Sequence, residues 1–316
     1  MVDTRTILAI SSIRGIGPKS LMAIVDHMNT NNVAPKSADE LFCYLDEYGP
    51  ARAKITEDKV YKAYNDAGYI IRESERQGIN ILTYFDANYP EILRSTMTED
   101  GKIDPPLILY YKGNLDILEK PSIAVIGTRE PTQEGVNAGL YLSSKIASLG
   151  YNIVSGLALG CDTTGHRGAL NANGGTIAFL AHGLDTVYPP QNRSLALEIL
   201  EKGGLLISEY PIGTPCNAYR LVARDRLQAG LALATLVVQT GIRGGTMHAV
   251  KSTLSSGKPL LTVRYNHTVM MHHNVMGNTA LISDGAIPVS QNTNIEAFLN
   301  SLNHKKTFKE EQLTLF

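Results

Sequence analysis

Six short apolar runs between residues 122 and 263 constrain the fold of this chain more than any other feature. The runs are SIAVIG, NIVSG, TIAFLAHG, GLLISEY, ATLVVQTG and KPLLTV. Segments long enough for a helix separate them, and short apolar strands alternating with helices are typical of a parallel sheet covered on both faces. We therefore predict an α/β fold with an extended Rossmann-like parallel sheet over residues 121–290.

The flanking segments predict a smaller helical domain before this sheet and a short extension after it. In residues 1–85 apolar positions recur every three or four residues, which is typical of amphipathic helices. Residues 86–120 contain a Tyr-Pro and a Pro-Pro dipeptide and favour an extended connector. Residues 291–316 are expected to form a C-terminal helix and a polar, flexible tail.

The composition indicates a globular protein of the cytoplasm. The hydrophobic fraction is 43%, and the formal net charge of -1 means that any nucleic-acid affinity must come from locally placed charges. Cys43, Cys161 and Cys216 are odd in number and lack the CxxC spacing of metal sites, which suits a reducing compartment. The apolar stretch from Leu231 to Val238 is too short to cross a bilayer.

Three of the predicted strands end in glycine-containing turns. In an open parallel sheet, ligands collect outside the carboxyl ends of the strands, where glycine lets a phosphate approach the backbone and helix N-termini attract anions. The GxGxxG fingerprint of NAD and FAD domains does not follow the first strand, so we expect no cofactor. The residues that predict a phosphate site at this rim are Gly127, Thr128, Arg129, Gly156, Arg243, Gly244 and Gly245.

An ordered series of motifs resembles those of one known family. In chain order they are SGLALGCD (155–162) with His166 just beyond, GGTIAFLAHGLDTVYP (174–189), SEYPIG (208–213), RDR (224–226), GGT (244–246) and the segment 277–286. From about Tyr89 to Ala286 the chain is similar in this way to the DNA-processing protein A family (DprA, or Smf).

The resemblance implies a function, a fold and a set of contact residues. Members of the family are non-enzymatic binders of single-stranded DNA that load a RecA recombinase and protect incoming strands, as in natural transformation and DNA uptake. They use an extended Rossmann fold and commonly form dimers. The partners implied here are single-stranded DNA, a RecA-type recombinase and a second copy of the chain, without a membrane. The implied DNA contacts are Gly127, Thr128, Arg129, Ser155, Gly156, Arg224, Arg226, Arg243, Gly244, Gly245 and Thr246.

The chain departs from the family pattern at several places. Leu221-Val222 stands where the family has Phe-Pro, so a base-stacking aromatic is missing, and Tyr219 lies close enough to replace it. Asp225 occupies the middle of the family's RNR motif, and its carboxylate opposes a phosphate. The winged-helix module at the C-terminus of many members is not recognised. The chain therefore resembles a divergent member.

Residues 224–226 have two interpretations. The arginines contact phosphate, or they form a structural ion-pair cluster in which Asp225 holds one of them. Glu209, just past a strand, either orients an arginine or is a charge at the rim.

Other polar residues favour structural roles. Asp162 is expected to be a helix N-cap, and His166, one turn later, a packed and hydrogen-bonded side chain rather than a catalyst. His272-His273 lacks ligands at metal spacing and predicts an exposed loop without a metal site.

Residues 13–19 (IRGIGPK) resemble the turn of a helix-hairpin-helix module, whose glycines let backbone amides meet a DNA phosphate. A tight turn between packed helices explains the same residues equally well.

Two other functions compete with DNA binding. One is a sensor of a nucleotide signal, for instance in phage defence, since its ligand would use the same rim. The other is a nucleoside-monophosphate phosphoribohydrolase, whose GGxGTxxE motif carries the catalytic glutamate. Ala249 stands at that position, so we expect no catalytic residue and no enzyme.

The last five residues, QLTLF, resemble the peptide by which bacterial proteins dock on the replicative sliding clamp. Gln312 would hydrogen-bond at a pocket edge, while Leu313, Leu315 and Phe316 would fill apolar pockets. The polar stretch 303–311 would serve as a tether. Packing of the tail on its own domain is the alternative.

Overall fold

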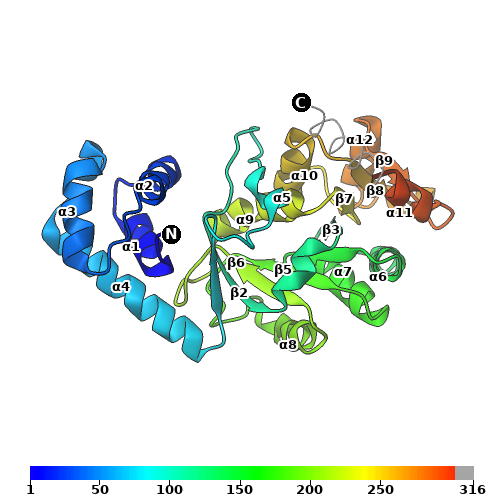
Figure 1. Cartoon of the computed structure of the whole chain (residues 1–316). Coiled ribbons are helices and arrows are strands. Elements are labelled where there is room, and N and C mark those ends of the chain that lie inside the picture. The colour runs from blue at the N-terminus through cyan, green and yellow to red at the C-terminus, as the bar shows by residue number, and fades with distance from the viewer. Residues whose placement is uncertain (303–316) are drawn as a thin grey trace.

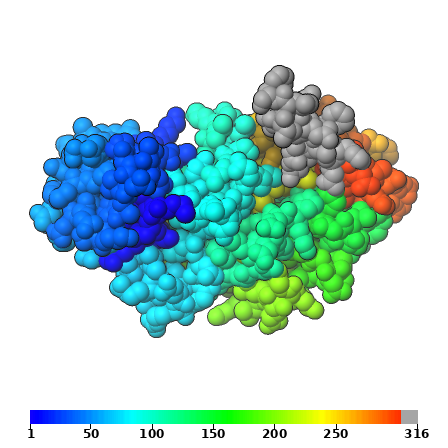
Figure 2. Space-filling model, in the orientation of Figure 1, coloured from blue at the N-terminus to red at the C-terminus, as the bar shows by residue number. Residues whose placement is uncertain are grey.

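The computed structural model describes residues 1–302. Four helices form the predicted N-terminal helical part, at one end of an elongated molecule (Figures 1 and 2). They are α1 (Thr4–Ser12), α2 (Pro18–Thr30), α3 (Ala38–Tyr48) and α4 (Glu57–Arg76).

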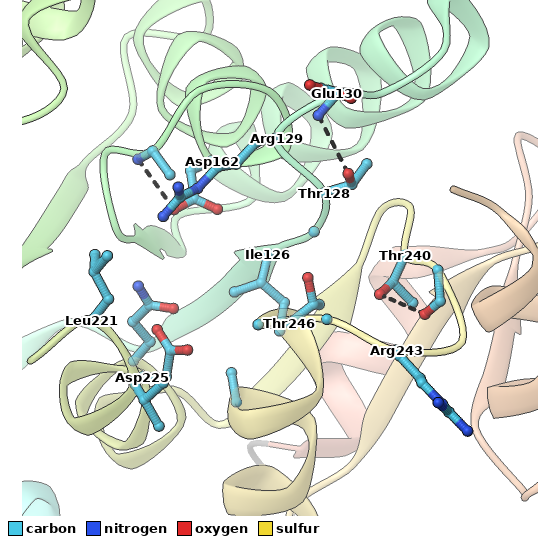
Figure 3. A pocket seen from close by; sticks show the side chains of 18 of the residues that line it. Ile126, Thr128, Arg129, Glu130, Asp162, Leu221, Asp225, Thr240, Arg243 and Thr246 are labelled. Carbon is cyan, nitrogen blue, oxygen red and sulfur yellow. Dashed lines mark hydrogen bonds between the residues drawn. The ribbon is translucent and has the colours of Figure 1, made fainter. Parts of the chain in front are cut away.

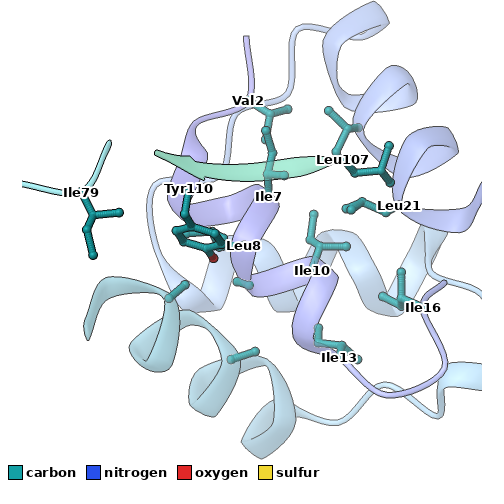
Figure 4. Close-up of a cluster of buried hydrophobic side chains, with 14 of the residues drawn as sticks. Val2, Ile7, Leu8, Ile10, Ile13, Ile16, Leu21, Ile79, Leu107 and Tyr110 are labelled. Carbon is teal, nitrogen blue, oxygen red and sulfur yellow. The ribbon is translucent and has the colours of Figure 1, made fainter. Parts of the chain in front are cut away.

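Local signals explain where these helices begin. The Asp3 carboxylate accepts from the backbone N–H of Thr6 at the start of α1, and the Ser37 hydroxyl accepts from that of Glu40 at the start of α3. The apolar faces of the helices meet in one buried cluster, shown in Figure 4, which Tyr110 joins from the sheet. The helical part is therefore packed onto the α/β part.

All six predicted strands are present. They are β3 (Ser122–Ile126), β4 (Asn152–Ser155), β5 (Thr176–Leu180), β6 (Leu205–Ser208), β7 (Ala234–Val237) and β8 (Leu260–Val263). Every residue of these six strands is buried, which is why their sequences are continuously apolar rather than alternating.

Three more strands come from segments for which none was predicted. They are β1 (Asn80–Thr83), β2 (Ile108–Gly113) and β9 (Ile287–Val289). β1 pairs antiparallel with β2, and β2 pairs antiparallel with β6. The sheet therefore extends into both the helical segment and the connector, although the proposed domain boundaries stay predictions.

The strand order creates a topological switch point in the sheet. Along the sheet it is β1-β2-β6-β5-β4-β3-β7-β8-β9, and β3 pairs in parallel with both β4 and β7. Successive strands from β3 to β6 run outward on one side, while β7 to β9 run outward on the other. The two directions diverge between β3 and β7, and such a switch point leaves a crevice at the carboxyl ends of the two strands.

Helices cover both faces of the sheet (Figure 1). One face carries α6 (Gln133–Ser148), α7 (Cys161–Asn171), α8 (Arg193–Glu201) and the helical residues 295–302. The other carries α5 (Glu91–Arg94), α9 (Ala218–Leu231), α10 (Thr246–Ser255) and α12 (Met276–Ser283), with α11 (His267–Met270) just before α12. Within residues 1–302 no helix has the length and apolar character that crossing a membrane requires.

Candidate nucleic-acid interface

A cavity of about 510 Å³ lies at the switch point (Figure 3). The turn after β3, the turn after β7 and the first half of α9 form its walls, and Asp162 of α7 lines it as well. Below we call it the rim pocket. Eight of the eleven predicted contact residues line it: Gly127, Thr128, Arg129, Arg224, Arg243, Gly244, Gly245 and Thr246.

The other three predicted residues lie outside the rim pocket. Gly156 lines a small adjoining slot together with Arg129. Ser155 is buried, and its hydroxyl donates to the backbone oxygen of Val125 at 2.6 Å. Arg226 is also buried, for the reason given below.

Arg129 and Arg243 are the exposed cations of the pocket. They come from the turns after β3 and β7, on opposite sides of the opening (Figure 3). Neither side chain forms a hydrogen bond or ion pair with another residue in the range 1–302. Both guanidinium groups are therefore free to meet an anion.

The turn after β7 is open to a ligand. A Cβ atom at Gly244 or Gly245 would meet nothing within 4 Å, and Gly244 has a φ of +153° that disfavours other residues. Helix α10 begins at Thr246, directly after this turn, and no side chain caps its N-terminus. The backbone N–H groups of Met247 and His248 donate to the oxygens of Gly244 and Gly245, and the positive end of the helix dipole favours an anion at this turn.

Gly127 and Gly156 are needed for packing. A Cβ at Gly127 would lie 2.6 Å from both the Cys161 Sγ and the backbone oxygen of Gln239. A Cβ at Gly156 would collide with the guanidinium of Arg224. Packing therefore already requires glycine at both positions, and their contact with phosphate stays a prediction.

Arg224 forms part of the pocket floor and is only 4% exposed. Its guanidinium donates to the backbone oxygen of Gly156 at 2.9 Å, to that of Phe179, and to the Asp225 carboxylate at 3.1 Å. These bonds hold the turn after β4 and the end of β5 against α9.

Arg226 fits the ion-pair interpretation. It donates two bonds of 2.7 Å to the Glu209 carboxylate, and Asp104 of the connector lies 2.7 Å from its Nε. Burial lowers the pKa of Arg226, but its hydrogen bonds to the two carboxylates outweigh burial and raise it overall. Glu209 therefore orients an arginine, and Arg226 ties the connector to α9.

The predicted N-cap role of Asp162 is wrong. Helix α7 starts at Cys161 after Gly160, whose φ of +76° turns the chain sharply, so Asp162 lies inside the first turn. Its carboxylate instead accepts from the backbone N–H groups of Gly156 at 3.0 Å and Ala158 at 3.3 Å. Burial raises the pKa of this carboxyl, and Arg224 opposes the increase.

His166 is a packed side chain, as predicted. Its Nδ1 lies 2.7 Å from the Thr176 hydroxyl, and its Nε2 accepts from the backbone N–H of Leu157. Burial, with Arg224 nearby, lowers the pKa of His166 to about 3, so the ring is neutral at physiological pH. His272 and His273 are exposed and stacked, and no three metal-ligating side chains come together in residues 1–302.

Three amide side chains that hold the rim were not predicted. Gln239 accepts from the backbone N–H of Thr132 and donates to its hydroxyl, which joins the two turns of the pocket. Asn274 donates to the backbone oxygen of Glu130 across the opening, and Asn278 accepts from the N–H of Thr240. The sequence pattern that could have identified Gln239 is a glutamine directly after an apolar run, as in VVQTG.

Tyr219, the turn at residues 13–19 and the C-terminal tail are the other predicted contacts. Tyr219 is 80% exposed beside the pocket-lining Ala218. In the turn between α1 and α2, Gly15 has a φ of +99°, and its backbone oxygen accepts from Arg52. This turn packs tightly, and its contact with DNA stays a prediction. The tail residues Gln312, Leu313, Leu315 and Phe316 lie outside the described residues.

The fold defines a Rossmann-like protein, and the pocket at its switch point is a candidate anion site formed by an uncapped helix N-terminus and two free arginines. More specifically, the chain belongs to the family of DNA recombination-mediator protein A, whose sequence pattern matches residues 80–302.

Individual relatives agree with this assignment. Protein Smf of Synechocystis is 31% identical over 300 residues, which cover 93% of this chain and 72% of that protein. Protein Smf of Escherichia coli is 34% identical over 174 residues, 55% of this chain and 45% of that protein.

Solved structures also share the fold. DNA processing protein A from Streptococcus pneumoniae has a TM-score of 0.74 at 25% identity, covering 94% of this chain and 98% of that one. DNA processing protein A from Helicobacter pylori, described for its single-stranded DNA binding mode, has a TM-score of 0.60 at 28% identity, with coverages of 72% and 96%.

Proposed function

We propose that this chain binds single-stranded DNA through the rim pocket and acts as a recombination mediator without enzymatic activity. In this role it loads or protects strands in the cytoplasm for a RecA-type recombinase, as in natural transformation or DNA uptake, and works as a homodimer. The observation that carries the proposal is the open turn at Gly244 and Gly245, placed before the uncapped end of α10 and between two free arginines.

The chemistry of the pocket suits a phosphodiester backbone. Backbone N–H groups and guanidinium groups bind phosphate without reading bases, so affinity should depend little on sequence. The Helicobacter pylori relative, described as binding single-stranded DNA, supports the same use of the fold. The turn at residues 13–19 is a second place where a strand would meet backbone amides.

A second candidate function is the sensing of a nucleotide signal. A cavity of about 510 Å³ falls within the range of small-ligand pockets, and its acidic residues Asp162 and Asp225 could accept hydrogen bonds from a base.

A phosphoribohydrolase is disfavoured, because Ala249 of α10 is apolar and buried where a catalytic carboxylate would be needed.

One competition experiment separates the candidates. A fluorescent single-stranded oligonucleotide is bound to the full chain and challenged with unlabelled single strand, duplex or a panel of free nucleotides. DNA binding predicts that single strand competes best and that mononucleotides compete only at far higher concentration. Displacement by one nucleotide at stoichiometric concentration would favour the sensor, and no binding of the oligonucleotide at low salt would refute DNA binding.

A further inference from the structure

The rim pocket carries as many carboxylates as cations. Its lining includes three guanidinium groups, on Arg129, Arg224 and Arg243, and three carboxyl groups, on Glu130, Asp162 and Asp225. With all six ionised, the formal charge is zero. A phosphate entering this pocket therefore meets unfavourable as well as favourable charge, and the balance depends on the acids.

Asp225 is a half-buried acid of this pocket, and its carboxylate accepts fewer hydrogen bonds than that of the buried Asp162. Its one hydrogen bond within residues 1–302 is the 3.1 Å bond from Arg224 Nε, and its side chain keeps 15% of its surface exposed, in the pocket. Asp162, in contrast, accepts two backbone N–H groups that hold the turn after β4. Glu130 is exposed to solvent at the rim.

The hydrogen-bond donor of Asp225 is held in place. Arg224, on the same helix, is fixed by the backbone oxygens of Gly156 and Phe179. The charged and titratable groups around Asp225 come from five elements: Arg224 on α9, Asp162 on α7, His248 on α10, Arg129 and Glu130 after β3, and Arg243 after β7.

We propose that Asp225 couples anion binding in the rim pocket to the uptake of one proton. This inference rests on the proposed function and adds a regulation of the same site. When phosphate enters, the negative charge beside Asp225 increases, and protonation of its carboxyl removes the repulsion and gives the pocket a net positive charge.

The electrostatics of the empty pocket support this coupling. Burial raises the pKa of Asp225 to about 6, although Arg224 lowers it. An added negative charge close to a carboxyl raises its pKa further. At neutral pH the carboxyl is therefore mostly ionised in the empty pocket, and a bound anion shifts it toward the protonated form.

The coupling predicts that anion affinity falls as the pH rises. Below the pKa of the empty pocket Asp225 is already protonated, so affinity is highest there and changes little with pH. Above it, each bound anion requires a proton, and affinity falls by up to about tenfold per pH unit until the pKa of the occupied pocket is passed.

The test compares the full chain with its Asp225→Asn variant. Binding of oligo-dT, whose phosphodiesters do not titrate, is measured at constant ionic strength from about pH 5 to about pH 8, around the pKa of Asp225. We expect the wild-type affinity to fall as the pH rises. The variant should keep, at every pH, the affinity that the wild type has at low pH. A His248→Gln control should retain the wild-type dependence, since it leaves Asp225 in place.

A second measurement counts the proton directly. Calorimetric titration at neutral pH in buffers of different ionisation enthalpy should show proton uptake by the wild type and its loss in Asp225→Asn. An unchanged pH profile or unchanged proton uptake in a folded Asp225→Asn chain would overturn the coupling while leaving DNA binding intact. Absence of binding by both chains at every pH would overturn the proposed function itself.

Discussion

Replacing Gly156 by alanine should destabilise the fold strongly, although the change adds one methyl group. The new Cβ would collide with the Arg224 guanidinium, which is only 4% exposed and fixed by its hydrogen bonds. Arg224 would have to give up its bonds to the backbone oxygens of Gly156 and Phe179. A hydrogen bond from a charged donor contributes about 1.5–3 kcal/mol, so losing two should cost about 3–6 kcal/mol.

The assay is urea unfolding followed by circular dichroism, with Gly17→Ala as the matched control. Gly17 has a negative φ, and a Cβ there would meet nothing within 4 Å, so its substitution should change the free energy of unfolding by about 1 kcal/mol or less. Equal stability of Gly156→Ala and Gly17→Ala would refute the reasoning that the glycine exists to admit Arg224.

Three further predictions follow from particular contacts and from the sequence. Glu209→Gln should lower the free energy of unfolding by about 1.5–3 kcal/mol, because Arg226 loses a charged acceptor, and a change near zero would show that Asp104 alone suffices. Truncation after Glu311 should abolish binding to a bacterial sliding clamp in a pull-down, whereas equal capture of both chains would remove the clamp proposal. Incubation with nucleoside monophosphates should release no free base, since Ala249 replaces the catalytic carboxylate, and release that a rim substitution abolishes would contradict this.

The sequence predicted the strands that are completely buried. β3 to β8 are buried throughout, so their apolar runs stand out. β1 and β2 were not predicted because they pair antiparallel at the end of the sheet, include exposed or half-buried residues, and lie on either side of the proline-containing segment. β9 spans three residues and includes a proline, which leaves little pattern to detect.

The sequence predicted only those site residues whose location follows from their position at the end of a strand. Turns after parallel strands meet at one rim, so Arg129 and Arg243 were correctly expected at the same opening. The packing of Arg224 against Gly156 joins residues 68 positions apart, which a single sequence does not reveal. The role of Asp162 was missed because the chain turns at Gly160, which is the N-cap, so the helix starts two residues earlier than an N-cap at Asp162 would place it.

The dependence of single-stranded DNA affinity on salt tests the central claim most directly. It should be measured for the wild type, Arg129→Ala, Arg243→Ala and the control Arg72→Ala, an exposed arginine on α4 far along the chain from the pocket. Each lost phosphate contact should reduce the log–log slope by roughly 0.7. The account predicts weaker binding and a smaller slope for both rim variants and no change for Arg72→Ala. Wild-type affinity and slope in both rim variants would contradict it.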